Sequence, residues 1–120
     1  MTDQYKEATE EHFRLRGWKE DSVGLWTAPI EGLVHRVYGF DLPPICESIK
    51  DWKKWIAEFM GREHCKMFMN KEYVEWHKFH DPINAPTAHF QVSYQKIKDH
   101  EILLASVLAC NEYLREKKNG

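Results

Sequence analysis

The chain has 120 residues, of which 42% are hydrophobic and 13% aromatic, and it carries 17 Lys and Arg against 19 Asp and Glu. This length suits one domain with a single core, and the aromatic content excludes an intrinsically disordered chain. The near balance of charge excludes the overall basic field that drives non-specific nucleic-acid binding.

The first helix is predicted over residues 2–16. Gly17, just beyond it, is a natural helix stop because glycine adopts the left-handed conformation without steric cost. The other faces carry acidic and basic side chains, so we expect one buried stripe and a solvated outer surface. The stripe, at helical spacing, consists of Tyr5, Ala8, His12 and Phe13.

Two short extended segments follow, at residues 25–28 and 32–40. Pro29-Ile30-Glu31 between them is a turn-like break, so the pair predicts a β-hairpin. Alternation of polar and apolar residues in the second segment is imperfect. We therefore expect a strand of a small sheet that is covered unequally on its two faces.

The second helix is predicted over residues 49–60. Ser48 is its N-cap, and Asp51 three residues later completes a capping box. Gly61 supplies the stop. The apolar residues at helical spacing, which we expect to be buried, are Ile49, Trp52, Ile56, Phe59 and Met60.

Three further strands are predicted at residues 65–69, 73–79 and 88–94, followed by a helix over residues 98–117 with Asp99 as its N-cap. This last helix is apolar almost all round, so it must be covered on more than one side, most simply by lying across a sheet. The fold class is therefore α+β, with a small, mainly antiparallel sheet packed with helices. The predicted element order is α-ββ-α-βββ-α.

Cys46, Cys65 and Cys110 are odd in number, and their spacing fits no disulfide framework. No stretch approaches the roughly 20 apolar residues of a membrane span. The charged residues 1–13 lack the apolar segment of a signal peptide. We expect a cytoplasmic protein whose reduced cysteines are small core residues.

Four segments carry loose aromatic or small-residue motifs: Gly17-Trp18, Leu25-Trp26-Thr27-Ala28-Pro29, Leu42-Pro43-Pro44-Ile45-Cys46-Glu47-Ser48, and Leu103-Leu104-Ala105-Ser106-Val107-Leu108-Ala109. Together they resemble the phage ABA sandwich domain, a group of small phage and prophage proteins. The likeness covers most of the chain from Phe13 onward, although the long segment 32–40 and a His-rich middle depart from the pattern. The resemblance implies a phage or prophage origin and a layered α/β fold, and it implies no activity.

Aromatic and cationic residues of the two hairpins form a candidate ligand site. If the hairpins lie side by side, the rings can stack on a nucleotide base and the cations can meet phosphate. The alternative is that both tryptophans are core residues and the cations are solvated, because no glycine-rich phosphate loop accompanies them. The candidate ligand-binding residues are Trp26, Arg36, Tyr38, Trp76, His77, Lys78 and His80.

A metal site is a further alternative, which requires His77, His80 or His89 to converge at a bend, with Asp81 as a further candidate ligand. Their spacing matches no zinc pattern, so ordinary surface or half-buried histidines explain it as well. We assign no metal and no other cofactor. No nucleophile can be paired with these imidazoles, so no catalytic residue is assigned either.

Trp52 and Trp55 lie three residues apart on the second helix, about 60° apart around its axis. Tryptophan is enriched at the centres of interfaces, so the pair is a candidate partner or dimer surface. The competing interpretation is a broad buried face.

We interpret the chain as a non-enzymatic phage accessory protein that acts by binding a host protein, for example to blunt host defence. One alternative is a protein that sequesters a small nucleotide signal. Another is a metal-dependent enzyme centred on His77 and His80. Membranes and nucleic acids are not expected partners, and a homo-oligomer is left open.

Overall fold

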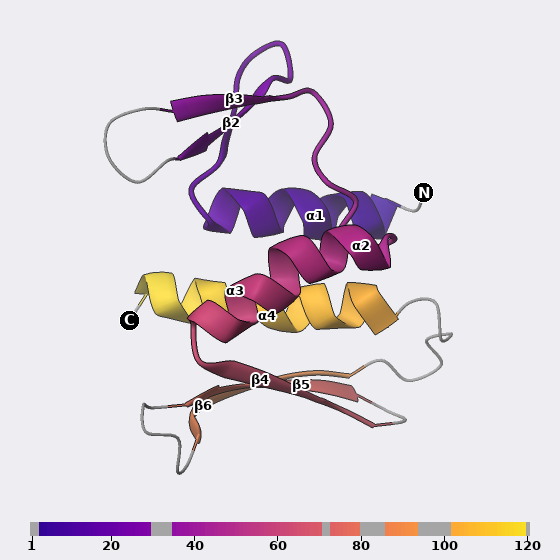
Figure 1. Cartoon of the computed structure of the whole chain (residues 1–120), viewed down its shortest axis with the longest axis vertical. Coiled ribbons are helices and arrows are strands. Elements are labelled where there is room, and N and C mark those ends of the chain that lie inside the picture. The colour runs from indigo at the N-terminus through magenta and orange to yellow at the C-terminus, as the bar shows by residue number, and fades with distance from the viewer. Residues whose placement is uncertain (1–2, 30–34, 71–72, 80–85, 94–101, 120) are drawn as a thin grey trace.

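The computed structural model has an α+β fold, in which helices lie between two separate three-stranded antiparallel sheets (Figure 1). It describes residues 3–29, 35–70, 73–79, 86–93 and 102–119. The elements are α1 (Asp3–Leu15), β1 (Lys19–Glu20), β2 (Trp26–Pro29), β3 (His35–Gly39), α2 (Ile49–Trp52), a π-helical turn (Lys53–Ala57), α3 (Glu58–Arg62), β4 (Cys65–Met69), β5 (Tyr73–Phe79), β6 (Pro86–Ser93) and α4 (Ile102–Asn119).

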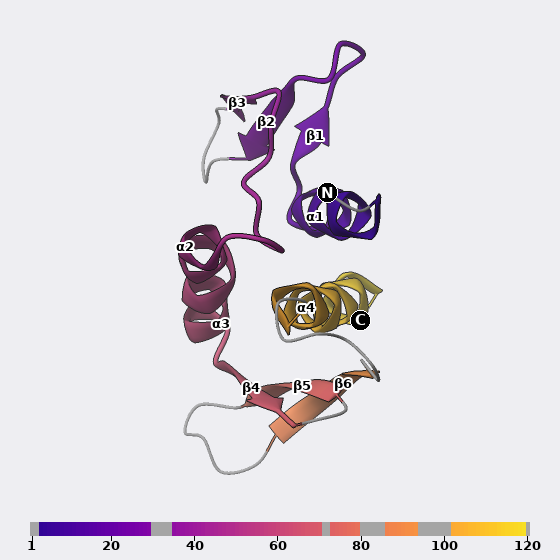
Figure 2. The same ribbon diagram turned by 90° about the vertical axis from the view of Figure 1, so that its right-hand side faces the viewer.

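The layers follow one another as sheet A (β1-β2-β3), α1, α4 and sheet B (β4-β5-β6), as Figure 2 shows. Helices α1 and α4 run in the same direction, because Ala8 and Glu11 of α1 are bonded to Asn111 and Arg115 of α4, respectively. The continuous helical segment from α2 to α3 crosses beside this pair and leads into β4.

Helix α4 is the centre of the core, as its apolar sequence predicts. Val107 and Cys110 have no exposed surface. Towards sheet B, the ring of Tyr113 stacks on Trp76 of β5 with centroids 6.0 Å apart. On the other side lies α1, so the prediction of a helix that lies across a sheet and is covered on several sides is confirmed. Its predicted N-cap, Asp99, lies outside the described residues.

The single expected sheet is in fact two sheets, and the element order gains one strand, β1. Since α4 is apolar almost all round, it takes sheet B on one side and α1 on another, and sheet A then lies beyond α1. The two-residue strand β1 is too short to leave an alternation in the sequence. It pairs with β2 through Lys19 and Glu20.

Two of the three predicted helix boundaries in the first half of the chain are confirmed. Gly17 ends α1 with φ +92°, and the N–H groups of Gly17 and Trp18 donate to carbonyls of the last turn in the Schellman pattern. The Ser48 hydroxyl accepts from the Asp51 N–H at 3.4 Å.

The third boundary, the predicted stop at Gly61, is wrong. Helix α3 continues through Gly61 to Arg62, and the chain then reverses at His64, whose φ of 53° is left-handed. A histidine therefore fills the role expected of the glycine. Ile49 is a second correction: the helical spacing predicts it on the buried face of the second helix, yet it is 54% exposed, because it is the first residue of α2 and lies at the end of the packed face.

The three cysteines are free and buried, as expected. None of the helices in the described ranges is long and apolar enough to cross a bilayer.

Candidate binding groove

The predicted ligand site divides between the two sheets. Trp26 belongs to β2 of sheet A and Trp76 to β5 of sheet B, and helices α1 and α4 lie between them (Figures 1 and 2). Both tryptophans are buried, each beneath its own sheet. The structure therefore does not bring the two hairpins side by side. The side chain of Arg36 and all of His80 lie outside the described residues.

In sheet B, the predicted site residues point to opposite faces of β5. Trp76 faces the core, and its indole Nε1 has no hydrogen-bond partner among the residues described. Lys78 donates from Nζ to the backbone carbonyl of Glu63. His77 lies on the outer face, where its Nε2 is 2.8 Å from a carboxylate oxygen of Glu75.

Tyr38 and Trp55, predicted for different sites, meet in one aromatic cluster. Their ring centroids are 6.3 Å apart, and Trp18 lies 5.1 Å from Tyr38 and 5.5 Å from Trp55. Burial raises the pKa of the Tyr38 hydroxyl, and the nearby Asp51 carboxylate raises it further. These tilted and edge-on contacts join sheet A to the helices, so the cluster has a structural role.

Trp52 is half-buried and points towards α4 rather than to solvent. Its Nε1 donates to the Ser106 hydroxyl at 2.7 Å. The pair Trp52 and Trp55 thus contributes to the packing of the α2–α3 segment against its neighbours.

In the part of the chain that the structure describes, no three His, Cys, Asp or Glu side chains are grouped in a way that could hold a metal ion. His80, Asp81 and the side chain of His89 lie outside that part, so the metal hypothesis stays a prediction.

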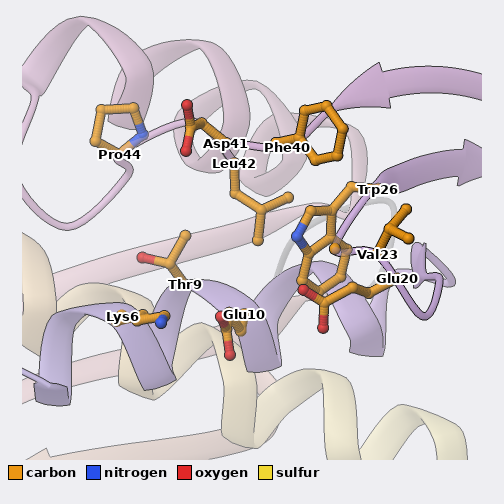
Figure 3. Close-up of a pocket in the computed structure, with 11 residues that line it drawn as sticks. Lys6, Thr9, Glu10, Glu20, Val23, Trp26, Phe40, Asp41, Leu42 and Pro44 are labelled. Carbon is orange, nitrogen blue, oxygen red and sulfur yellow. The ribbon is translucent and has the colours of Figure 1, made fainter.

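A groove of about 630 Å³ opens between α1 and sheet A, and Trp26 forms its back wall (Figure 3). Lys6, Thr9 and Glu10 of α1 form its floor, and the 40–44 segment after β3 lies across from them.

The rim of the groove carries large apolar side chains that are exposed to solvent. Val23 is 72% exposed and Phe40 is 65% exposed, whereas Trp26 at the back is only 2% exposed. Val23 is held in place by a turn in which the Asp21 carboxylate accepts from the N–H groups of Val23 and Leu25, both at 2.9 Å. The apolar rim is therefore attached to an ordered turn.

Charge is concentrated at one side of the groove. Arg14 bridges Glu10 of α1 and Glu20 of β1, with N–O distances of 3.5 and 3.2 Å. The same guanidinium lies over the Trp26 ring, 5.1 Å from its centroid. The groove thus combines an aromatic wall, an apolar rim and a pair of carboxylates at one side.

Of these lining residues, only Trp26 is predicted as a site residue from the sequence. The others come from three separate chain segments, and none has a local motif that marks a site. One sequence feature could have indicated the groove. In Phe40-Asp41-Leu42, two apolar residues flank an acid directly after a strand.

Comparison with models of protein families gave no match. Comparisons with curated proteins and with solved structures gave no match either.

Proposed function

We propose that this protein acts by binding another protein, and that a segment of the partner lies in the groove between α1 and sheet A. The observation that carries the proposal is the apolar rim of Val23 and Phe40 around a groove whose back wall is the buried Trp26. Exposed apolar residues gathered around a concave site are characteristic of protein interaction surfaces. Trp26 is already buried in the free protein, so an occupant would gain most from covering the exposed side chains of Val23 and Phe40.

A host protein, met in the cytoplasm of an infected cell, is the partner class that we propose. This part of the proposal is supported by the resemblance to the phage ABA sandwich domain. It is therefore an inference from family likeness, and the groove supports only the binding itself.

Site-specific photo-cross-linking in bacterial cells tests the proposal. A photoreactive amino acid replaces Val23 in one variant and Glu58, an exposed residue of α3 away from the groove, in a matched control. We expect a discrete cross-linked product from position 23 that is absent from position 58. The Phe40→Ser substitution should diminish that product. Equal products from both positions, or none from position 23, would contradict binding in the groove.

A nucleotide-binding role is the second candidate, and the outer face of sheet B favours it. No described element covers this face (Figures 1 and 2). There His77 contacts Phe68 edge-on at 5.0 Å and stacks with Phe79 at 6.3 Å, while Lys66 lies 5.5 Å from the Phe79 ring centroid. Of these rings, Phe68 is 50% exposed, and an exposed ring beside a cation can stack on a base.

Thermal-shift screening against nucleotides tests this second role, since a ligand well above its Kd raises the melting temperature. A shift that Phe68→Ala abolishes supports it. A melting temperature unchanged by every nucleotide in the screen would contradict it.

A further inference from the structure

The lining of the groove carries more acid than base. Among the described lining residues, Glu10, Glu20 and Asp41 supply three carboxylates and Lys6 supplies an ammonium group, and Arg14, which bridges Glu10 and Glu20 from beside the groove, adds a second cation. Such a lining attracts a cationic ligand and repels an anionic one. A free nucleotide or a phosphorylated segment is therefore a poor occupant of this groove.

The interactions of Arg14 show how a cation binds beside Glu10 and Glu20. Its guanidinium uses one oxygen of Glu10 and one of Glu20. Within the described ranges, the second oxygen of each carboxylate has no partner, so each retains acceptor capacity. The guanidinium also lies over the Trp26 ring, which is the favoured position for a cation near an aromatic face.

The indole N–H of Trp26 is a donor that an occupant of the groove can use. Trp26 is 2% exposed, and the nitrogen side of its ring faces the groove interior, towards Leu42 (Figure 3). Among the described residues, Trp76 Nε1 and not Trp26 Nε1 is the buried side-chain nitrogen without a partner, so water in the groove can satisfy the Trp26 N–H. A carbonyl of a bound segment can take the place of that water.

We infer that the occupant is an extended segment of the partner protein in which a Lys or Arg lies beside a large apolar residue. The basic side chain ends at Glu10 and Glu20, the apolar side chain packs against Phe40 and Leu42, and a backbone carbonyl accepts from Trp26. This inference rests on the proposed function, because it names the chemistry of the segment that the groove binds.

Selection from a random peptide library on the full-length protein tests the inference. We expect the selected peptides to share a Lys or Arg next to an apolar residue, and their Kd to rise at least tenfold between low and high salt, because screening weakens the charge pair. The double variant Glu10→Gln, Glu20→Gln should weaken binding at least tenfold. The matched control Glu58→Gln, on α3, should leave it unchanged. Phe40→Ser, at a position that is 65% exposed and therefore tolerant of change, should also weaken binding.

The outcomes separate the inference from the proposed function. Peptides that lack a basic residue, ignore both glutamine substitutions and are lost with Phe40→Ser would overturn the inference and leave groove binding intact. A selection that yields no peptide sensitive to any groove variant would overturn both. Circular dichroism of each variant confirms that lost binding is not lost folding.

Discussion

The imidazole Nδ1 of His12 lies 3.1 Å from the side-chain oxygen of Asn111, and this contact joins the first helix to the last across 99 positions of the chain. Asn111 in turn donates from Nδ2 to the carbonyl of Ala8 at 3.1 Å. On its other nitrogen, His12 faces Arg16 Nη1 at 3.3 Å, so a neutral imidazole that donates from Nδ1 and accepts at Nε2 satisfies both contacts. The buried network is complete only with His12 uncharged.

Acid should therefore destabilise the protein through His12. Burial, followed by the charge of Arg16, lowers the pKa of His12 from 6.5 to about 3. Below pH 6.5 the unfolded chain binds a proton that the folded chain does not, so the free energy of unfolding falls as the pH drops from 6.5 towards 3. At pH 5 the loss relative to pH 7 is about 2 kcal/mol. Urea unfolding at several pH values measures it.

His12→Gln provides the control, because glutamine keeps hydrogen-bonding groups near Asn111 and does not titrate. The variant is expected to be less stable than the natural protein at pH 7 and to have a shallower pH dependence. Of the seven histidines, the other six are present in both proteins, so the difference in slope isolates His12. Identical slopes would show that His12 is not the group responsible.

Much of the fold can be predicted from periodicity. His12, Phe13 and Val107 are buried where the helical stripe places them, because a 3.6-residue period determines which face of a helix is apolar. For Trp26 and Trp76, which lie on strands, the sequence leaves two interpretations open, a shared pocket or burial in the core, and both side chains are buried. Their assignment to one pocket requires the pairing of distant strands, which the local sequence does not encode.

The groove was harder to predict from the sequence than the fold. Its residues come from α1, from the hairpin of β1 and β2, and from the segment after β3, and only tertiary packing brings these together. The helix boundary at Gly61 fails for a related reason. Glycine is tolerated inside a helix at modest cost, and His64 takes the left-handed position instead.

Two glycine substitutions should have opposite effects on stability. Gly17 has a φ of +92°, and a Cβ there would lie 3.3 Å from Pro29 Cγ, so Gly17→Ala should destabilise the protein by about 1–2 kcal/mol. Gly61 lies inside a helix with open space around it, so Gly61→Ala should stabilise the protein by about 0.5–1 kcal/mol. Chemical denaturation measures both. A destabilising Gly61→Ala would mean that the helix does not continue through this position.

The hydrogen bond between Trp52 and Ser106 should appear as coupling in a double-mutant cycle. Trp52 Nε1 donates to the Ser106 hydroxyl, which itself donates to the carbonyl of Leu103, both at 2.7 Å. Trp52→Phe and Ser106→Ala each remove the same bond, so their combined effect on the free energy of unfolding should fall short of the sum by about 0.5–1.5 kcal/mol. Strict additivity would show that the two side chains do not interact in solution.

The three cysteines should be unreactive in the folded protein. Burial raises the pKa of the Cys46 thiol to about 11, and burial also raises the pKa values of the Cys65 and Cys110 thiols. At pH 8 each is a buried thiol rather than an accessible thiolate, so alkylation must wait for opening of the structure. For a domain of ordinary stability, this slows labelling by roughly 10³-fold or more relative to the unfolded chain.

Mass spectrometry after a timed pulse of iodoacetamide should find no label in buffer and three labels in urea. Rapid labelling of Cys110 in buffer would show that α4 is not enclosed between α1 and sheet B, and the layered fold would then have to be revised.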